Sequence, residues 1–261
     1  VGIGVRELTF EAGGRRGNPP PAVDLTRRVS MGREFFRTPL KTYTDWPTAW
    51  WREAIQNAVD AGARTVRLDV VAESDGAVRV SAEDDGGGMD LDTLLGRFLA
   101  LGGTSKTGAA GGVGGFGKAK ELLILPWLGW EIRTRDAVVR GAGGDYTEPE
   151  RTERIPGTRL TVWMDGGECT TAEHAKAFIR KCHLPRVAFS VNGSAVLAGD
   201  APGEQQREFR AAAGAVTLTV HHDKEAESTA WMAVRAAGLH MFDVYVADVP
   251  GRLVCEMHGR S

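Results

Sequence analysis

The sequence predicts an α/β protein folded as a two-layer sandwich: helices cover a mainly antiparallel sheet, and a β-rich extension follows toward the C-terminus. Turn residues within alternating stretches, at 74–76 and at Asn192-Gly193, favour β-hairpins. Residues 46–61 and 172–182 carry apolar side chains at helical spacing. Strands and helices do not alternate regularly, which argues against a parallel sheet of βαβ units.

The first half of the chain should contain most of the helices. An irregular arm or strap is expected over residues 1–45, which hold several glycine and proline breakers. A helix should begin after Asp45 and end at Gly62, followed by a hairpin over 65–83. Further helices are expected at 91–101 and 118–125, on either side of a loop with eight glycines, residues 102–117.

The second half should be mostly strands, interrupted by the amphipathic helix 172–182. Strands are expected at residues 130–134, 137–140, 159–164, 187–197 (a hairpin), 215–221, 229–234, 241–247 and 253–257. We therefore divide the chain into the arm 1–45, a main domain 46–185, and a region 186–261. That last region either extends the sandwich or begins a transducer domain.

Composition indicates a globular chain. Of 261 residues, 42% are hydrophobic and 25% charged, which excludes disorder, collagen and coiled coil as overall descriptions. The net charge of −2 gives no reason to expect strong nonspecific nucleic-acid binding. No apolar run approaches the roughly 20 residues of a membrane span, so no membrane partner is expected. The chain begins at Val1 and is interpreted as a fragment of a longer protein.

The three cysteines suggest a reducing compartment, most simply the cytoplasm, because they are odd in number and form no C-x-x-C. Cys182 and His183 are neighbours, but no second pair stands at zinc spacing. Buried thiols are therefore expected there rather than a metal site.

The glycine-rich stretch fits three phosphate-binding patterns, and it reads Gly112-Val113-Gly114-Gly115-Phe116-Gly117-Lys118-Ala119. A dinucleotide fingerprint and a P-loop both need a preceding strand, and the P-loop needs Ser or Thr where Ala119 stands. The third interpretation is a lid, with backbone N–H groups of residues 114–118 turned toward phosphate oxygens at the start of a helix.

Three other motifs accompany the glycine run. They are Glu53-Ala54-Ile55-Gln56-Asn57-Ala58-Val59-Asp60-Ala61, Asp84-Asp85-Gly86-Gly87-Gly88-Met89 and Gly157-Thr158. In this order and spacing, the four motifs resemble the GHKL superfamily and its ATP-binding Bergerat fold, found in gyrase B subunits, MutL, ninety-kilodalton heat-shock chaperones and histidine kinases. The resemblance covers residues 46–164, and residues 101–117 resemble a MutL-like or chaperone-like lid.

The helix motif suits two chemical tasks, because residues four apart share one helix face. The resemblance implies that Asn57 ligates Mg²⁺ through its amide oxygen and that Glu53 is the catalytic base for the attacking water. It also implies that Asp84 accepts a hydrogen bond from the adenine amino group, with Thr158 nearby. The other implied nucleotide contacts are Asp60, Gly86, Gly88, Met89, Thr104, Ser105, Lys106, Gly112, Gly114, Gly115, Phe116, Gly117 and Lys118.

Two positions depart from the family pattern. Asp85 stands where members often have Asn, and Ala119 stands where a last glycine can stand. We interpret Asp85 as tolerated and the change at Ala119 as mild, since MutL-like lids also carry Ala there.

The resemblance implies an ATPase that requires Mg²⁺ and acts as a conformational switch in a larger machine. The alternative is an ATP-binding regulatory or kinase-like module with negligible hydrolysis; a P-loop or dinucleotide enzyme is a third hypothesis. Histidine kinases usually lack a water-activating glutamate, so Glu53 favours hydrolysis. The implied partners are ATP, a second copy of the chain bound through the strap, and a protein or nucleic-acid client.

Overall fold

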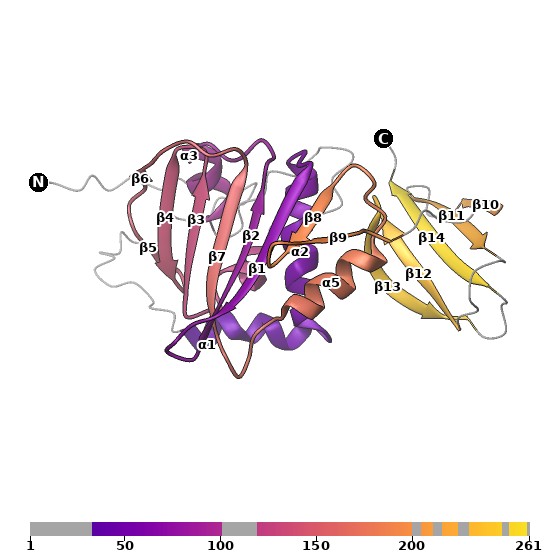
Figure 1. Ribbon diagram of the computed structural model, residues 1–261, viewed down its shortest axis with the longest axis horizontal. Coiled ribbons are helices and arrows are strands. Elements are labelled where there is room, and N and C mark those ends of the chain that lie inside the picture. Colours follow the sequence, from indigo (N-terminus) through magenta and orange to yellow (C-terminus); the bar gives the residue numbers. More distant parts are fainter. Residues whose placement is uncertain are drawn as a thin grey trace, which may run out of the picture. The chain divides into compact units, whose positions relative to one another are not determined.

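The computed structural model describes residues 33–100, 119–199, 205–210, 216–223, 230–246 and 251–259, and residues 31–261 form one compact unit (Figure 1). The helical elements are α1 (Arg33–Arg37), the 3₁₀ turn η1 (Thr38–Thr42), α2 (Trp46–Asp60), α3 (Leu91–Thr93), the π-helical turn η2 (Leu94–Phe98), α4 (Ala119–Leu123) and α5 (Ala172–Lys181).

The first sheet contains nine strands among the described residues, in the order β5-β4-β3-β7-β2-β1-β8-β9, with β6 also paired to β4. They are β1 (Thr65–Ala72), β2 (Ala77–Asp84), β3 (Gly129–Thr134), β4 (Ala137–Ala142), β5 (Asp145–Tyr146), β6 (Glu150–Arg151), β7 (Thr158–Asp165), β8 (Ala188–Val191) and β9 (Ser194–Val196). Only β1 and β8 pair in parallel; the other pairings in this sheet are antiparallel.

Helix α2 is the main helix on this sheet, and its sequence explains its ends. The Asp45 side chain caps the first turn by accepting from the Thr48 N–H at 3.2 Å. Trp50, Trp51 and Ile55 are fully buried on one face, and the Trp50 indole donates to the Leu123 carbonyl at 3.1 Å. Helices α2 and α5 contact each other and strands β2 and β1, so both lie on one face of the sheet. The predicted two-layer α/β sandwich is therefore confirmed.

A second sheet follows, in the order β10-β11-β14-β12-β13. Its strands are β10 (Gln205–Arg210), β11 (Val216–Asp223), β12 (Trp231–Ala236), β13 (Leu239–Tyr245) and β14 (Arg252–Gly259). Strands β12 and β14 are parallel, and the other neighbours are antiparallel. This sheet confirms the β-rich C-terminal region, although β10 was not among the predicted strands.

The structure differs from the sequence analysis at two helical segments. Residues 33–42, predicted as part of an extended arm, form α1 and η1, because Phe36 and Leu40 enter the core at 5% and 4% exposure. The helix predicted over residues 91–101 is shorter: α3 ends at Thr93, and the wider turn η2 follows from Leu94 and ends at Phe98. Among the described helices, none is long and apolar enough to cross a bilayer.

Candidate functional site

Helix α2 carries three of the predicted site residues on the side away from the core. The Asn57 and Asp60 side chains are exposed, while Glu53 is half-buried. The Glu53 carboxylate forms an ion pair with Arg52 at 3.5 Å. Burial raises the pKa of Tyr43, and the charge of Glu53 raises it further, so this phenol lies within electrostatic reach of the predicted base.

Asp84 ends β2 and begins the glycine turn. Its carboxylate accepts from the Gly86 N–H at 2.8 Å and from the backbone N–H of Thr158. Burial raises the pKa of Asp84, and these two hydrogen bonds oppose that shift because they favour the charged form. The structure thus brings Asp84 and the backbone of Thr158 together.

The glycine turn is joined to the end of α2. The Gly87 N–H donates to the Ala61 carbonyl at 2.9 Å, just beyond the last residue of α2. A Cβ at Gly86 would lie 2.8 Å from the Cβ of Ala61. Only glycine permits this close approach, which holds the turn beside the helix that carries Asn57.

Gly88 and Gly157 are packed just as closely against backbone. Both have a positive φ of 62°, a region that favours glycine. A Cβ at Gly157 would stand 2.0 Å from the Asp84 carbonyl oxygen, and one at Gly88 would stand 2.6 Å from the Gly157 carbonyl oxygen. Position 157 therefore requires glycine, because its backbone packs directly against Asp84. This contact explains why Gly157-Thr158 accompanies the Asp84 motif, although the dipeptide alone is weak evidence.

Thr134, at the end of β3, was not predicted and links these segments. It is fully buried, accepts from the Met89 N–H at 2.7 Å and donates toward the Gly157 carbonyl at 3.1 Å. Its hydroxyl also lies 3.1 Å from that of Thr158. The neighbouring Arg135 donates from Nε to the Gly87 carbonyl at 3.1 Å. No local pattern marks Thr134, since its partners lie in segments distant in sequence.

Asp85, the departure from the family pattern, has a structural task. Its Oδ1 accepts from the backbone N–H groups of Arg64 and Thr65 at 2.7 and 2.8 Å. These bonds fasten the turn to the start of β1, and they lower the pKa of Asp85 despite the opposing effect of burial. The Oδ1 of this exposed residue is therefore occupied by the start of β1.

Lys120 is a second polar residue that the sequence analysis did not identify. It is 3% exposed, and its Nζ donates to the carbonyls of Phe98, at 2.9 Å, and Ala100. Burial lowers its pKa. A lone lysine in a short helix gives no sequence signal for such a contact, which joins α4 to the end of η2 and the residues just after it.

The predicted lid residues lie outside the described residues: Thr104, Ser105, Lys106, Gly112, Gly114, Gly115, Phe116, Gly117 and Lys118. Met89 is partly buried against the core, and Gly86 and Gly88 are half-buried. A cavity of about 890 Å³ opens elsewhere, beside Arg64 and Arg186, and no predicted site residue lines it.

No protein-family model matches the chain. Over 117 residues it is 43% identical to the DNA mismatch repair protein MutL of Methanocorpusculum labreanum. That stretch is 45% of this chain and 18% of the relative, so the chain spans less than a fifth of the relative's length. The match confirms the resemblance drawn from the four motifs. Among solved structures, the MutL ATPase domain of Aquifex aeolicus complexed with ADP aligns with a TM-score of 0.44 and 14% identity, over 79% of this chain and 88% of that one.

Proposed function

We propose that this chain binds ATP with Mg²⁺ and hydrolyses its terminal phosphate, using binding and turnover as a conformational switch. The observation that carries the proposal is the half-buried Asp84 carboxylate, held by backbone donors inside a turn whose glycines leave no room for side chains. Sequence identity to a MutL protein supports the same conclusion.

The site suits an adenine base because Asp84 keeps acceptor capacity. An ionised carboxylate offers about four lone-pair sites, of which the Gly86 and Thr158 N–H groups use two. An adenine amino group is a donor that the carboxylate accepts. A guanine carbonyl would instead place a second acceptor against the Asp84 carboxylate. Two acceptors that face each other without a hydrogen bond are costly in a half-buried site.

The residues on α2 fit the metal and the water. The exposed amide of Asn57 supplies the oxygen ligand that Mg²⁺ prefers, and Mg²⁺ commonly takes few protein ligands beside phosphates and water. When bound, Mg²⁺ neutralises phosphate charge. Glu53, one turn earlier, holds a water for attack and accepts its proton. To do so, the Glu53 carboxylate must contact the water while it is also paired with Arg52.

That ion pair also supports a second candidate function, an ATP-binding module with negligible turnover. If Arg52 keeps the Glu53 carboxylate occupied, nucleotide binds but no group is placed to accept the proton. The Asp84 turn serves both functions equally. The two candidate functions predict the same nucleotide binding and differ only in the rate of phosphate release.

Two substitutions on α2 separate binding from chemistry. Glu53→Ala should keep ATP affinity and lower phosphate release by about 100-fold or more, the usual scale for a general base. Asn57→Ala should weaken binding of ATP in the presence of Mg²⁺. Arg52→Ala is the matched control: it frees the Glu53 carboxylate and should not reduce turnover. Wild-type turnover in Glu53→Ala would exclude the catalytic role, and unchanged binding of Mg-ATP in Asn57→Ala would exclude the metal role.

The same proposal extends to the oligomeric state, the partners and the location of the chain. We infer an ATP-dependent homodimer and an unidentified protein or nucleic-acid client, in the cytoplasm. Light scattering with and without a nonhydrolysable ATP analogue tests the dimer: one unchanged mass in both states would contradict it.

A further inference from the structure

The loop between β3 and β4 holds an arginine in a backbone conformation that long side chains rarely adopt. Thr134 pairs with Ala137 across a loop of two residues, Arg135-Asp136. Arg135 has a φ of 50°, in the left-handed region that favours glycine. Two other described hairpin loops have a positive φ at their first residue, and they read Asn192-Gly193 and Ala237-Gly238. Strain of this kind persists where the surrounding structure enforces it, and it gathers at functional sites.

The Arg135 side chain lies against the glycine turn that begins at Asp84. Its Nε donates to the Gly87 carbonyl at 3.1 Å. Its stem passes close to Gly88, where an added Cβ would stand 3.1 Å from the Arg135 Cγ. Its Nη1 lies 3.8 Å from the carboxylate of Asp90, just after the turn. One side chain therefore contacts three successive parts of the turn.

Gly87 is held from two directions. Its N–H donates to the Ala61 carbonyl at 2.9 Å, just beyond α2, and its carbonyl accepts from Arg135. The preceding N–H, of Gly86, donates to the Asp84 carboxylate at 2.8 Å. Glycine by itself restricts the backbone very little, so the two bonds to Gly87 fix the peptide that follows this donor. The direction of the Asp84 carboxylate thus depends on both bonds.

The Nε donor of Arg135, rather than its charge, makes the closer contact. The ion pair with Asp90 is long at 3.8 Å, and the two side chains are 34% and 59% exposed. Exposed pairs of this kind contribute little to stability. The Nε–H bond to Gly87 has an ordinary hydrogen-bond length and ends on the backbone of the turn itself.

We propose that Arg135 is a positioning residue of the nucleotide site: its Nε–H fixes the Gly87 peptide, which in turn orients the Asp84 carboxylate toward the base. The inference rests on the proposed function, because it assigns a role within that same site. The strained backbone at Arg135 is what places this donor at the turn. Removing the donor should therefore weaken ATP binding without unfolding the chain.

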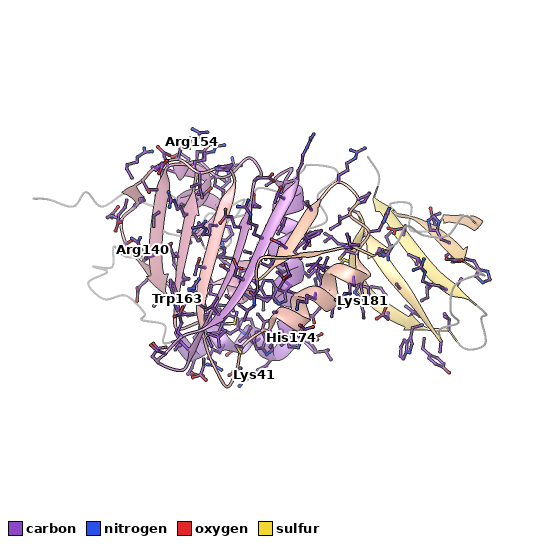
Figure 2. The ribbon with its side chains drawn as sticks, in the orientation of Figure 1. Lys41, Arg140, Arg154, Trp163, His174 and Lys181 are labelled. Atoms are coloured by element: carbon purple, nitrogen blue, oxygen red, sulfur yellow. The ribbon has the colours of Figure 1, made fainter. Side chains whose placement is uncertain are left out.

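Two variants of similar length separate the donor from the charge. Arg135→Gln removes the charge but keeps an N–H near the position of Nε, whereas Arg135→Met removes both. Titration calorimetry should give an ATP affinity within twofold of wild type for Arg135→Gln and at least fivefold weaker for Arg135→Met. Arg154→Met is the matched control, since Arg154 is an exposed arginine at the end of the first sheet (Figure 2). Its neighbour Ile155 donates from its N–H to the Arg135 carbonyl at 2.9 Å, and the control should bind ATP as wild type.

Arg135→Gly distinguishes positioning from a loss of stability. Glycine adopts the positive φ without strain, so the free energy of unfolding should not fall, while ATP affinity should drop as in Arg135→Met. Ala237→Gly makes the same backbone change at a φ of 50° in the second sheet, and it should leave ATP affinity unchanged. Denaturant titration and calorimetry on the same samples give the two quantities.

The outcomes separate this role from the proposed function. If the wild-type chain binds no ATP, the proposed function fails and the role of Arg135 fails with it. If the wild type binds ATP and Arg135→Met binds it equally tightly, only the positioning role is overturned. An equal loss of affinity in Arg135→Gln and Arg135→Met would overturn it too, because the charge and not the Nε donor would then be responsible. A parallel loss of affinity and stability in Arg135→Gly would mean that the residue supports only the fold.

Discussion

Asp84 combines a favourable role in the proposed nucleotide binding with an unfavourable one in folding. Burial raises the pKa of its carboxyl group, so the folded chain holds the ionised form less readily than the unfolded chain does. Between the two pKa values the folded state binds more protons, and the free energy of unfolding therefore falls as the pH rises through that window. At neutral pH the ionised Asp84 carries this full cost.

Asp84→Asn should separate the two effects. ATP affinity should fall by about 1.5–3 kcal/mol, the range for a hydrogen bond to a charged group, because the amide can present a donor to the adenine amine. The melting temperature without nucleotide should stay the same or rise, since the buried charge is gone. Calorimetry of binding and of unfolding checks both. An affinity within twofold of wild type would exclude Asp84 as the base-recognising group.

Thr134→Val tests the hydroxyl that joins Met89 and Gly157. Valine keeps the shape but leaves the partly buried Met89 N–H without its acceptor. The free energy of unfolding should fall by about 1–3 kcal/mol, the cost of an unsatisfied buried group. Denaturant titration measures it, and Thr134→Ser, which keeps the hydroxyl, is the control. A Thr134→Val chain as stable as Thr134→Ser would mean that the network contributes little.

At the scale of a turn, comparing alanine substitutions at Gly157 and Gly76 separates the cost of a steric clash from the cost of backbone strain. Gly157→Ala should destabilise the chain and weaken nucleotide binding, because its Cβ would stand 2.0 Å from the Asp84 carbonyl oxygen at a φ of 62°. Gly76→Ala is the control: its φ is 87°, and nothing lies within 4 Å of the added Cβ. The control should cost about 1–2 kcal/mol from the positive φ alone. Equal unfolding free energies for both variants would contradict the packing described for Gly157.

The elements predicted best from sequence are those specified by nearby residues. The span of α2 follows from Asp45 and the buried stripe with Trp50, and the hairpin turns follow from their glycines. Thr134 and Lys120 were not predicted because their partners are distant in sequence: Thr134 bonds across 45 residues to Met89, and Lys120 across 22 to Phe98. Such contacts depend on strand order and register, which a local pattern does not contain.

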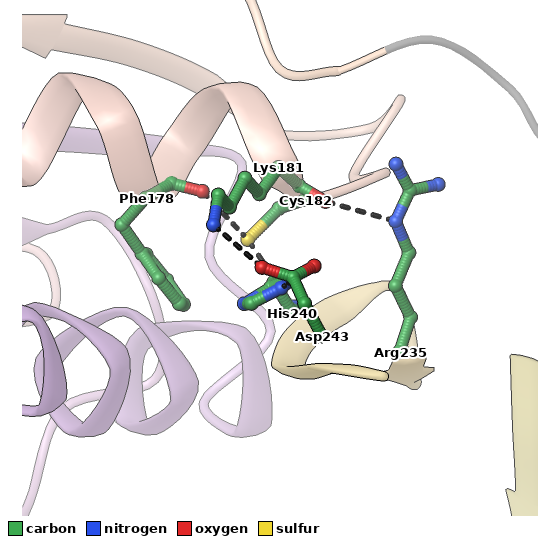
Figure 3. A network of polar contacts seen from close by, with 6 residues as sticks. All are labelled: Phe178, Lys181, Cys182, Arg235, His240 and Asp243. Carbon is green, nitrogen blue, oxygen red and sulfur yellow. Dashed lines mark hydrogen bonds and ion pairs between the residues drawn. The ribbon is translucent and has the colours of Figure 1, made fainter. Parts of the chain in front are cut away.

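Across the whole molecule, a polar link connects α5 to the second sheet. His240 Nε2 lies 2.9 Å from Asp243 Oδ1, and Lys181 donates to the other carboxylate oxygen at 2.8 Å (Figure 3). Burial lowers the pKa of His240; Asp243 opposes this shift, and Lys181 and Arg235 add to it. The folded chain thus favours neutral histidine.

The link predicts a loss of stability in acid. Because the folded pKa of His240 lies below the unfolded one, the folded state binds fewer protons between them. The free energy of unfolding should therefore fall as the pH drops below about 6.5, the ordinary histidine value. His240→Gln should remove that part of the pH dependence in denaturant titrations at several pH values. An unchanged pH profile would mean that the histidine is not the responsible group.

The construction of the Asp84 turn has a consequence for the lifetime of the protein. Its parts come from β2, β3, β7 and the end of α2, so under the proposed function a chain that loses any of these pairings loses the nucleotide as well. A ligand that binds only the folded state stabilises it by RT ln(1 + [L]/Kd), about 2.7 kcal/mol at a ligand concentration of 100 times the Kd. Cells short of ATP should then contain a larger fraction of unfolded chain, open to proteases. Protein abundance would become a second readout of nucleotide supply, alongside the proposed switch.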